Sequence, residues 1–177
     1  IQVHPDDELA QEIGLHNGKT EMWYVMHAEK DANLASGFNR DITPQEFENA
    51  IKDKSLGDML NYEKVQNDDV FFIPARKIHA LGAGCMVAEI QQTSDTSYRV
   101  YDWDRIDRFG MQRQLHIDEA LATINFKKED SGKVKYDKKA KNSTVNLVSC
   151  PYFTTNVIKL DAESALKKDY SELDSFV

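Results

Sequence analysis

Four residues in the first half of the chain have the side chains and the spacing of a metal site. Gln2 and His4 are two positions apart, so on an extended strand both side chains lie on one face. Glu21 precedes the apolar run 22–26, and His79 follows the turn at Pro74. Two histidines and one carboxylate are the usual protein ligands of an open, catalytic zinc site. The side-chain amide oxygen of Gln2 would supply a fourth ligand, although spacing alone also allows these histidines to be structural residues.

The segments around these residues are predicted to be β-strands, which would give a metal a rigid platform. Aromatic and β-branched runs bounded by turn signals such as Asn17-Gly18 are typical of short strands in a sandwich or barrel. The predicted strands cover residues 1–4, 20–28, 34–38, 62–65, 70–73, 78–81, 85–92 and 98–101.

Three short helices are expected beside these strands. The clearest begins at Thr43, because Pro44 suits the first helical position and Glu46 completes a capping box. Residues 6–13 and 118–124 are the other two candidates, and residues 56–60 could add one more turn. The helix after Thr43 would be a small insertion in a mostly β fold.

Composition excludes several functional classes. The 177 residues carry a formal net charge of -8, which argues against nucleic acid as a partner because phosphates need a basic face. No apolar run approaches the length of a membrane span. The two cysteines, Cys85 and Cys150, form no C-x-x-C motif, so neither a thiolate zinc site nor a disulfide framework is expected, and a cytoplasmic location fits. The oligomeric state is not predicted.

The second half of the chain divides less clearly. Residues 1–105 are predicted to form the barrel that carries the metal site. Residues 106–142 are predicted to be a linker with a short helix and a solvated, lysine-rich loop from 127 to 142. Residues 143–177, with strands at 145–148 and 153–160, are predicted to begin a second β-domain. Because the chain starts with Ile1 inside a strand-like segment, we expect it to be a piece of a longer protein.

Five consecutive motifs resemble those of the type I, zinc-dependent mannose-6-phosphate isomerases, whose fold is a cupin-like jelly-roll barrel. Their order and approximate spacing also resemble that family, mainly between residues 1 and 105. The motifs are QVHPD at 2–6, GKTEMWY at 18–24, IHALG at 78–82, EIQQTSD at 89–95 and YRVYDWDR at 98–105.

The resemblance implies roles for individual residues. It places Gln2, His4, Glu21 and His79 on the zinc ligands of the family. It places Arg99 on the arginine assigned to catalysis, and Lys19 and Glu89 on polar residues that line the substrate pocket. The implied activity is the interconversion of mannose-6-phosphate and fructose-6-phosphate.

The chemistry of an aldose–ketose isomerisation agrees with these roles. A proton leaves the carbon beside a carbonyl, and a negative enediolate must be stabilised before the proton returns to the neighbouring carbon. Arg99 can stabilise this charge, because a guanidinium remains charged in any pocket. Glu89 can shuttle the proton, since it alternates with Ala88 and Ile90 and should face away from these apolar residues. Lys19 could be a second proton-transfer group or could hold the phosphate.

Two other functions remain open from the sequence. Two histidines and a carboxylate on a cupin also hold iron(II) in oxygenases, although Gln2 would occupy a position that oxygen needs. A non-catalytic sugar-binding cupin would keep the barrel but would need no proton shuttle.

Overall fold

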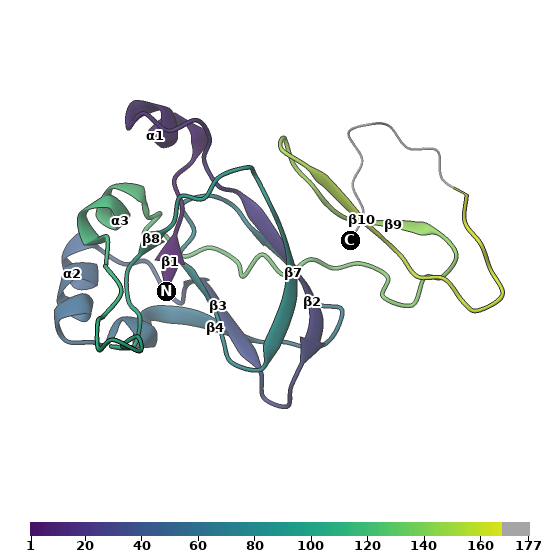
Figure 1. Ribbon diagram of the computed structural model, residues 1–177, viewed down its shortest axis with the longest axis horizontal. Coiled ribbons are helices and arrows are strands. Elements are labelled where there is room, and N and C mark those ends of the chain that lie inside the picture. The colour runs from purple at the N-terminus through teal and green to yellow at the C-terminus, as the bar shows by residue number, and fades with distance from the viewer. Residues whose placement is uncertain (168–177) are drawn as a thin grey trace.

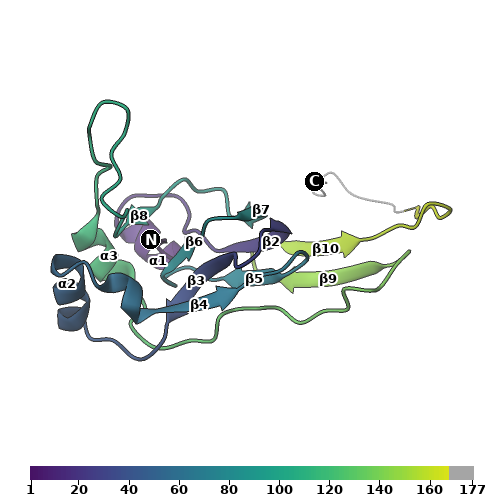
Figure 2. The same ribbon diagram turned by 90° about the horizontal axis from the view of Figure 1, so that it is seen from below.

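Two antiparallel β-sheets form the body of the molecule in the computed structural model, which describes residues 1–167 (Figures 1 and 2). The five-stranded sheet has the order β4 (Leu60–Lys64), β3 (Asn33–Phe38), β6 (His79–Leu81), β1 (Gln2–Val3), β8 (Tyr98–Arg99). The three-stranded sheet has the order β5 (Val70–Ile73), β2 (Glu21–Ala28), β7 (Cys85–Gln91). Each of these strands lies within two residues of the segment predicted from sequence.

The three-stranded sheet buries both of its faces, because successive side chains on a strand point to opposite sides. Trp23 and Phe71 lie on the inner face, in a core that also contains Val25 and Leu34. Met22 and its neighbours on the outer face pack under the C-terminal part of the chain, in a second core. The inner face therefore carries the candidate site, and packing on the outer face holds the strands in place.

The helices cover one end of the five-stranded sheet. Helix α2 (Pro44–Lys52) begins at Thr43 with both hydrogen bonds of a capping box, which confirms the prediction from sequence. Phe47 and Ala50 of this helix enter the largest core, together with Ala120 of helix α3 (Ile117–Thr123). Helix α1 (Asp7–Glu12) and the 3₁₀ turn η1 (Leu56–Met59) also lie where the sequence placed them.

Residues 127–142, predicted to be a solvated loop, form no helix or strand, but this segment, the strap, lies against the edge of the three-stranded sheet. Gly132 accepts a hydrogen bond from Phe72 N, and Val134 donates to Val70 O, so the strap continues the sheet beyond β5. Val134 and Tyr136 pack into the outer core. Most of its lysines are exposed, as the sequence indicated, and the two apolar side chains alternate with lysines and face the core.

Charge pairs fix this strap to the end of β5. Asp69 is buried, and it forms ion pairs with Lys133 and Lys138, both from the strap. Asp68 beside it pairs with Lys159 at 2.7 Å. Burial raises the pKa of Asp69, but hydrogen bonds from Lys133 and Lys138 outweigh this effect and leave the pKa below its usual value.

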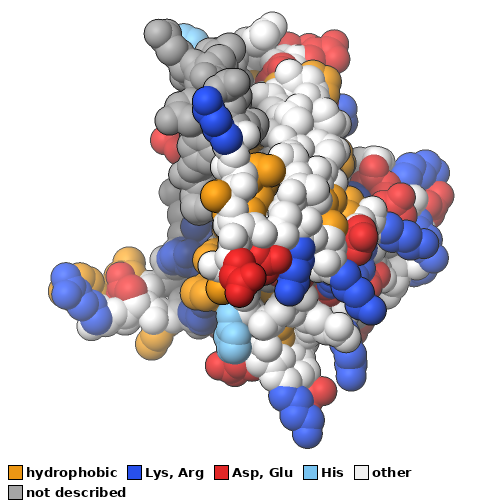
Figure 3. Space-filling model, turned by 90° about the vertical axis from the view of Figure 1, so that its right-hand side faces the viewer, with side chains coloured by type: hydrophobic (Ala, Val, Ile, Leu, Met, Phe, Trp, Pro, Cys, Tyr) orange, Lys and Arg blue, Asp and Glu red, His pale blue; other side chains and the backbone are white. Residues whose placement is uncertain are grey.

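The last strands, β9 (Thr144–Ser149) and β10 (Thr154–Ile158), form a separate two-stranded sheet. Leu147 and Val148 cover the outer face of the three-stranded sheet, and hydrophobic side chains gather among polar and charged ones on this side of the molecule (Figure 3). The described residues thus include the expected late strands, while the three-part division at residues 105 and 142 stays a prediction. Residues 168–177 of the third part lie outside the described residues.

The chain between β8 and α3 extends from the body as a loop (Figure 2). Asp102 at its base is buried and pairs with Arg105 and Arg113, which holds the two sides of the loop together. Within residues 1–167, no helix has both the length and the hydrophobicity needed to cross a membrane.

Replacing Asp69 by Asn should lower the free energy of unfolding by about 2 kcal/mol, because one hydrogen bond to a charged group contributes roughly that amount and asparagine keeps one of the two acceptor oxygens. Urea denaturation at pH 7 measures this change. The folded pKa of Asp69 is depressed, so its stabilisation is present above roughly pH 4 and is lost as the pH falls through the folded pKa. The difference between the two proteins should therefore shrink on acidification.

Asp31→Asn is the matched control, because Asp31 is exposed and pairs loosely with Lys64 at 3.7 Å. Its left-handed backbone suits asparagine as well as aspartate. Equal effects of the two substitutions would show that the strap is not held by Asp69.

Candidate metal centre and its surroundings

Three side chains from different strands converge between the two sheets. His4 follows β1, Glu21 begins β2 and His79 begins β6. One nitrogen or oxygen atom from each residue lies within 4.8 Å of the others, and all three side chains are buried. These residues are 17 to 75 positions apart in the sequence. The pairing of β1 with β6 brings His4 close to His79, and the packing of the two sheets brings Glu21 against both. Such a group can hold a metal ion.

Backbone carbonyls fix the orientation of both imidazole rings. His4 Nδ1 lies 3.0 Å from Thr96 O, and His79 Nδ1 lies 2.8 Å from Lys77 O. A carbonyl only accepts hydrogen bonds, so each Nδ1 carries the proton and each Nε2 presents a lone pair toward Glu21. This arrangement, in which the far ring nitrogen donates to a carbonyl, is usual for metal-binding histidines.

Both histidines, His4 and His79, are uncharged at neutral pH. Burial lowers the pKa of His4 to about 3, and the positive charge of Lys19 acts in the same direction. Burial likewise lowers the pKa of His79 to about 4, against the opposing charge of Glu21. The contacts of both rings with the Glu21 carboxylate, each 3.3 Å, are therefore not ion pairs at neutral pH.

The lone pairs that face one another need a cation. His4 Nε2 and both carboxylate oxygens of Glu21 are buried and have no hydrogen-bond donor among the described residues. Acceptors that face acceptors in a dry interior are costly unless a positive charge lies between them. The donor set and its orphaned atoms therefore fit a divalent metal.

Gln2 adds a fourth polar group beside this set. It lies opposite His79 in the register of β1 and β6, and its Nε2 donates to His79 Nε2 at 3.2 Å. Rotating the terminal amide by 180° would present the oxygen at the same place, and an amide oxygen is a suitable metal ligand. The structure thus brings together all four predicted ligands.

Lys19 and Glu89 lie next to the cluster. Lys19 Nζ is 3.5 Å from Glu21 Oε2 and 3.6 Å from Glu89 Oε1. The lysine side chain is 9% exposed and the Glu89 side chain 35%, so Glu89 is the more accessible of the two. Glu89 faces the interior, and Ile90 packs in the outer core, as the alternation along β7 predicted.

The position of Lys19 is set by the turn in which it lies. Three successive amides are bound: Gly18 N to Asp7 Oδ1, Lys19 N to Pro5 O, and Thr20 N to Gln92 Oε1. A Cβ atom on Gly18 would lie only 2.4 Å from the backbone carbon of Asp6. The absence of a side chain at Gly18 therefore allows the turn to approach α1 and places Lys19 beside Glu21.

Arg99 lies on β8, which is separated by β1 from the strand β6 that carries His79. It is opposite Gln2 in the register of β1 and β8, and directly paired residues project to the same face of a sheet. Its Nη1 donates to Gln114 O at 2.9 Å, at the base of the extended loop. The backbone thus places Arg99 beside the cluster, while its guanidinium binds a carbonyl rather than another predicted site residue.

Sequence reasoning missed some groups that support the site. Trp23 lies in the apolar run 22–26 and was not predicted to belong to the site, yet its indole nitrogen donates to Glu89 Oε2 at 2.8 Å. Its spacing of two from Glu21 was the available signal, because it places both side chains on one strand face. The carbonyls of Lys77 and Thr96 leave no signal in the sequence, since every residue has one.

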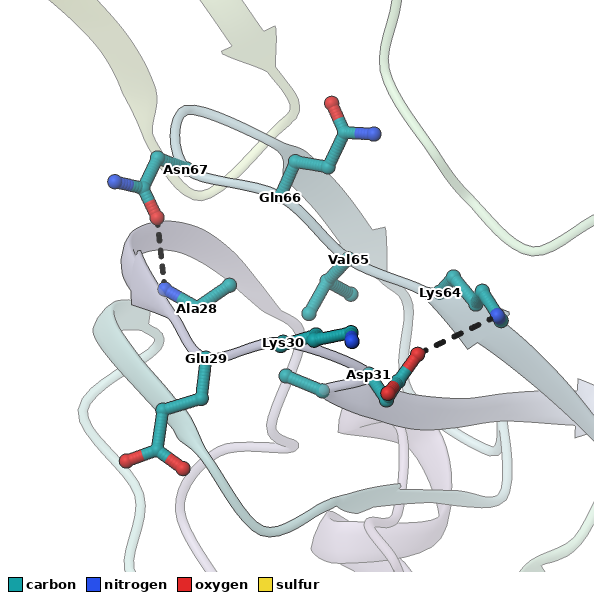
Figure 4. A pocket seen from close by; sticks show the side chains of 9 residues that line it. Ala28, Glu29, Lys30, Asp31, Lys64, Val65, Gln66 and Asn67 are labelled. Atoms are coloured by element: carbon teal, nitrogen blue, oxygen red, sulfur yellow. Dashed lines mark hydrogen bonds and ion pairs between the residues drawn. The ribbon is translucent and has the colours of Figure 1, made fainter.

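A surface pocket lies elsewhere and contains none of these residues. It is lined by the turn after β2 and the segment after β4, including Glu29, Lys30, Asp31, Lys64 and Asn67 (Figure 4). Lys64 and Asp31, which pair across it, are both strongly exposed. Nothing in this pocket resembles a catalytic group arrangement, so we place the candidate site at the buried cluster.

Comparisons with known proteins show the family to which the chain belongs. The mannose-6-phosphate isomerase ManA of Bacillus subtilis is 34% identical over 173 residues, which are 95% of this chain and 54% of that protein. The chain is a homologue of the mannose-6-phosphate isomerases. A probable mannose-6-phosphate isomerase of the same organism, GmuF, is 36% identical over 93% of the chain and 53% of its own length.

A solved structure of a Bacillus subtilis mannose 6-phosphate isomerase superposes with a TM-score of 0.76 at 31% identity. The match covers 87% of this chain and 49% of the chain in that structure. A putative mannosephosphate isomerase from Archaeoglobus fulgidus shares the fold, with a TM-score of 0.61 at 22% identity. No protein-family model matches the chain. The mostly β, cupin-like fold and the resemblance to mannose-6-phosphate isomerases are thus confirmed, and the chain spans about half the length of its curated relatives.

Replacing Gly18 by Ala should disturb Lys19 before it disturbs the rest of the fold. The added methyl group would force the turn away from Asp6 and withdraw Lys19 Nζ from Glu21 and Glu89. We expect the melting temperature to fall by several degrees, since overpacking typically costs about 1–3 kcal/mol. Differential scanning calorimetry measures the shift.

Gly57→Ala provides the comparison, because a methyl group there meets only the Tyr62 hydroxyl at 3.4 Å. It should leave the melting temperature nearly unchanged. A Gly18→Ala protein as stable as the Gly57→Ala protein would mean that the turn tolerates a side chain.

Proposed function

We propose that this chain carries the catalytic centre of a zinc-dependent mannose-6-phosphate isomerase. The observation that supports this most strongly is the set of orphaned acceptors on His4 and Glu21 beside His79, with Lys19 and Glu89 at its edge. Metal donors and proton-transfer groups in one interior are what an aldose–ketose isomerisation needs. Homology over almost the whole chain supports the same reaction and the same phosphorylated hexose substrate.

Zinc is the proposed metal, and Gln2, His4, Glu21 and His79 are its proposed ligands. Two imidazoles, a carboxylate and an amide oxygen form a donor set that suits zinc. When bound, zinc would supply Lewis-acid polarisation of the sugar oxygens. An iron-dependent oxygenase is not favoured, because the homologues are isomerases and Gln2 would occupy a position that such an enzyme needs for oxygen.

The remaining residues have complementary proposed roles. Glu89 removes the proton from C2 of the open-chain aldose and returns it to C1, while the hydroxyl proton at O2 is transferred to O1. Lys19 lies 3.6 Å from Glu89 Oε1, where it can stabilise the carboxylate or relay a proton. Arg99 would leave its carbonyl partner and stabilise the negative enediolate oxygens. Atoms balance without an oxidant or reductant, because the two sugars are isomers.

The setting of the reaction belongs to the same proposal. We infer a small-molecule substrate, with neither nucleic acid nor membrane as a partner, and a cytoplasmic location, in line with the formal net charge of -8 and with cysteines that form no disulfide.

A coupled assay of fructose-6-phosphate formation from mannose-6-phosphate tests the proposal. Turnover should disappear after treatment with a chelator, because the proton-transfer groups alone do not stabilise the enediolate sufficiently. Adding zinc back should restore it. The assay is run on the complete protein that contains this chain. If the folded, zinc-loaded protein shows no turnover, the proposed activity is wrong and a sugar-binding function replaces it.

Replacing His79 by Ala should reduce bound zinc from about one equivalent to a small fraction, because loss of a ligand opens the set to water. Metal content after gel filtration measures this without relying on activity. His27→Ala is the matched control, since His27 is exposed on the same strand as Glu21 and should retain full zinc content. Undiminished zinc in the His79 variant would rule out the ligand assignment.

A further inference from the structure

Trp23 connects the metal centre to Glu89. Its indole nitrogen donates to Glu89 Oε2 at 2.8 Å, a normal length for a hydrogen bond to a charged acceptor. Its ring meets the His79 ring edge to face, with 5.5 Å between centroids. Trp23 is 2% exposed and is therefore fixed by the inner core rather than by solvent.

The two carboxylate oxygens of Glu89 have different surroundings. Oε2 is occupied by the indole, and Oε1 lies 3.6 Å from Lys19 Nζ. Because Trp23 and Glu89 are directly paired in the register of β2 and β7, the hydrogen bond runs between side chains on the same sheet face. A glutamate that is 35% exposed would otherwise sample several side-chain rotamers.

We propose that Trp23 is a positioning residue for the proton transfer: its N–H holds Glu89 Oε2 so that Oε1 is the oxygen that meets the substrate. This inference rests on the proposed isomerase function. A single buried donor thereby selects one rotamer of the shuttle and one of its two oxygens. The same indole ring packs against the His79 ring, so one buried side chain contacts both the proposed proton shuttle, Glu89, and a proposed metal ligand.

Trp23→Phe tests this role, because phenylalanine keeps an aromatic ring beside His79 and removes only the N–H and part of the ring area. We expect kcat for mannose-6-phosphate isomerisation to fall about ten- to a hundredfold, the usual effect of one hydrogen bond to a charged group. KM and zinc content should remain within about twofold. Trp103→Phe is the matched control, since Trp103 is 49% exposed and lies on the extended loop.

A double-mutant cycle separates positioning from general packing. In a Glu89→Gln background, Trp23→Phe should change kcat by less than about twofold, because the oxygen that it positions no longer acts as a base. A loss of the same size in both backgrounds would mean that Trp23 acts only through packing, and the proposal would be wrong.

A spectroscopic measurement keeps the test independent of activity. With ¹⁵N-labelled tryptophan, the Trp23 indole proton should shift upfield in Glu89→Gln, because an amide oxygen is a weaker acceptor than a carboxylate. The Trp103 resonance, assigned from Trp103→Phe, should not move. An unshifted Trp23 resonance would overturn the proposal. Absence of isomerase turnover in the wild-type protein would instead disprove the proposed function and leave this hydrogen bond still measurable.

Discussion

The site depends on a carboxylate that is buried beside nitrogen atoms that cannot neutralise it. Glu21 is fully buried, and its oxygens face the Nε2 atoms of two histidines whose pKa values burial lowers to about 3 and 4. The carbonyls of Thr96 and Lys77 hold the ring protons on the far side. Lys19, at 3.5 Å, supplies some positive charge, but it is shared with Glu89. A divalent cation bound between these groups would remove this electrostatic cost and would link metal binding to the stability of the fold.

Strand register explains how such a cluster can be built from distant residues. His79, Gln2 and Arg99 form one row across β6, β1 and β8, and Trp23 pairs with Glu89 across β2 and β7. Slipping any of these strands by one residue would turn its polar side chains out of the interior and its apolar ones inward. The outer core under β9 and β10 therefore matters for chemistry, since Met22 can point outward only if Glu21 and Trp23 point inward.

Sequence reasoning succeeded where a residue type carries its own geometry. The capping box at Thr43 and the alternation along β7 each predict a backbone conformation directly, and both are confirmed. It did not anticipate that Val134 and Tyr136 of the lysine-rich strap pack into the outer core, because composition was given more weight than these two apolar residues. The oxygen to which each ring proton points, and the carbonyl that holds Arg99, depend on tertiary contacts that no local pattern encodes.

The side chains of the site differ widely in the fraction of their surface that is exposed to solvent. His79 and Glu21 side chains are 0% exposed, that of Lys19 is 9% and that of Glu89 is 35%. His4, Glu21 and His79 are therefore the most sheltered groups, where charge interactions are strongest, and the proposed proton shuttle, Glu89, is the most exposed. Glu89 is thus the group of this set that is most accessible to a molecule in solution. Trp23 contacts both the most and the least sheltered of these groups. Its ring packs against His79 and its N–H donates to the Glu89 carboxylate, so these two residues keep a fixed separation.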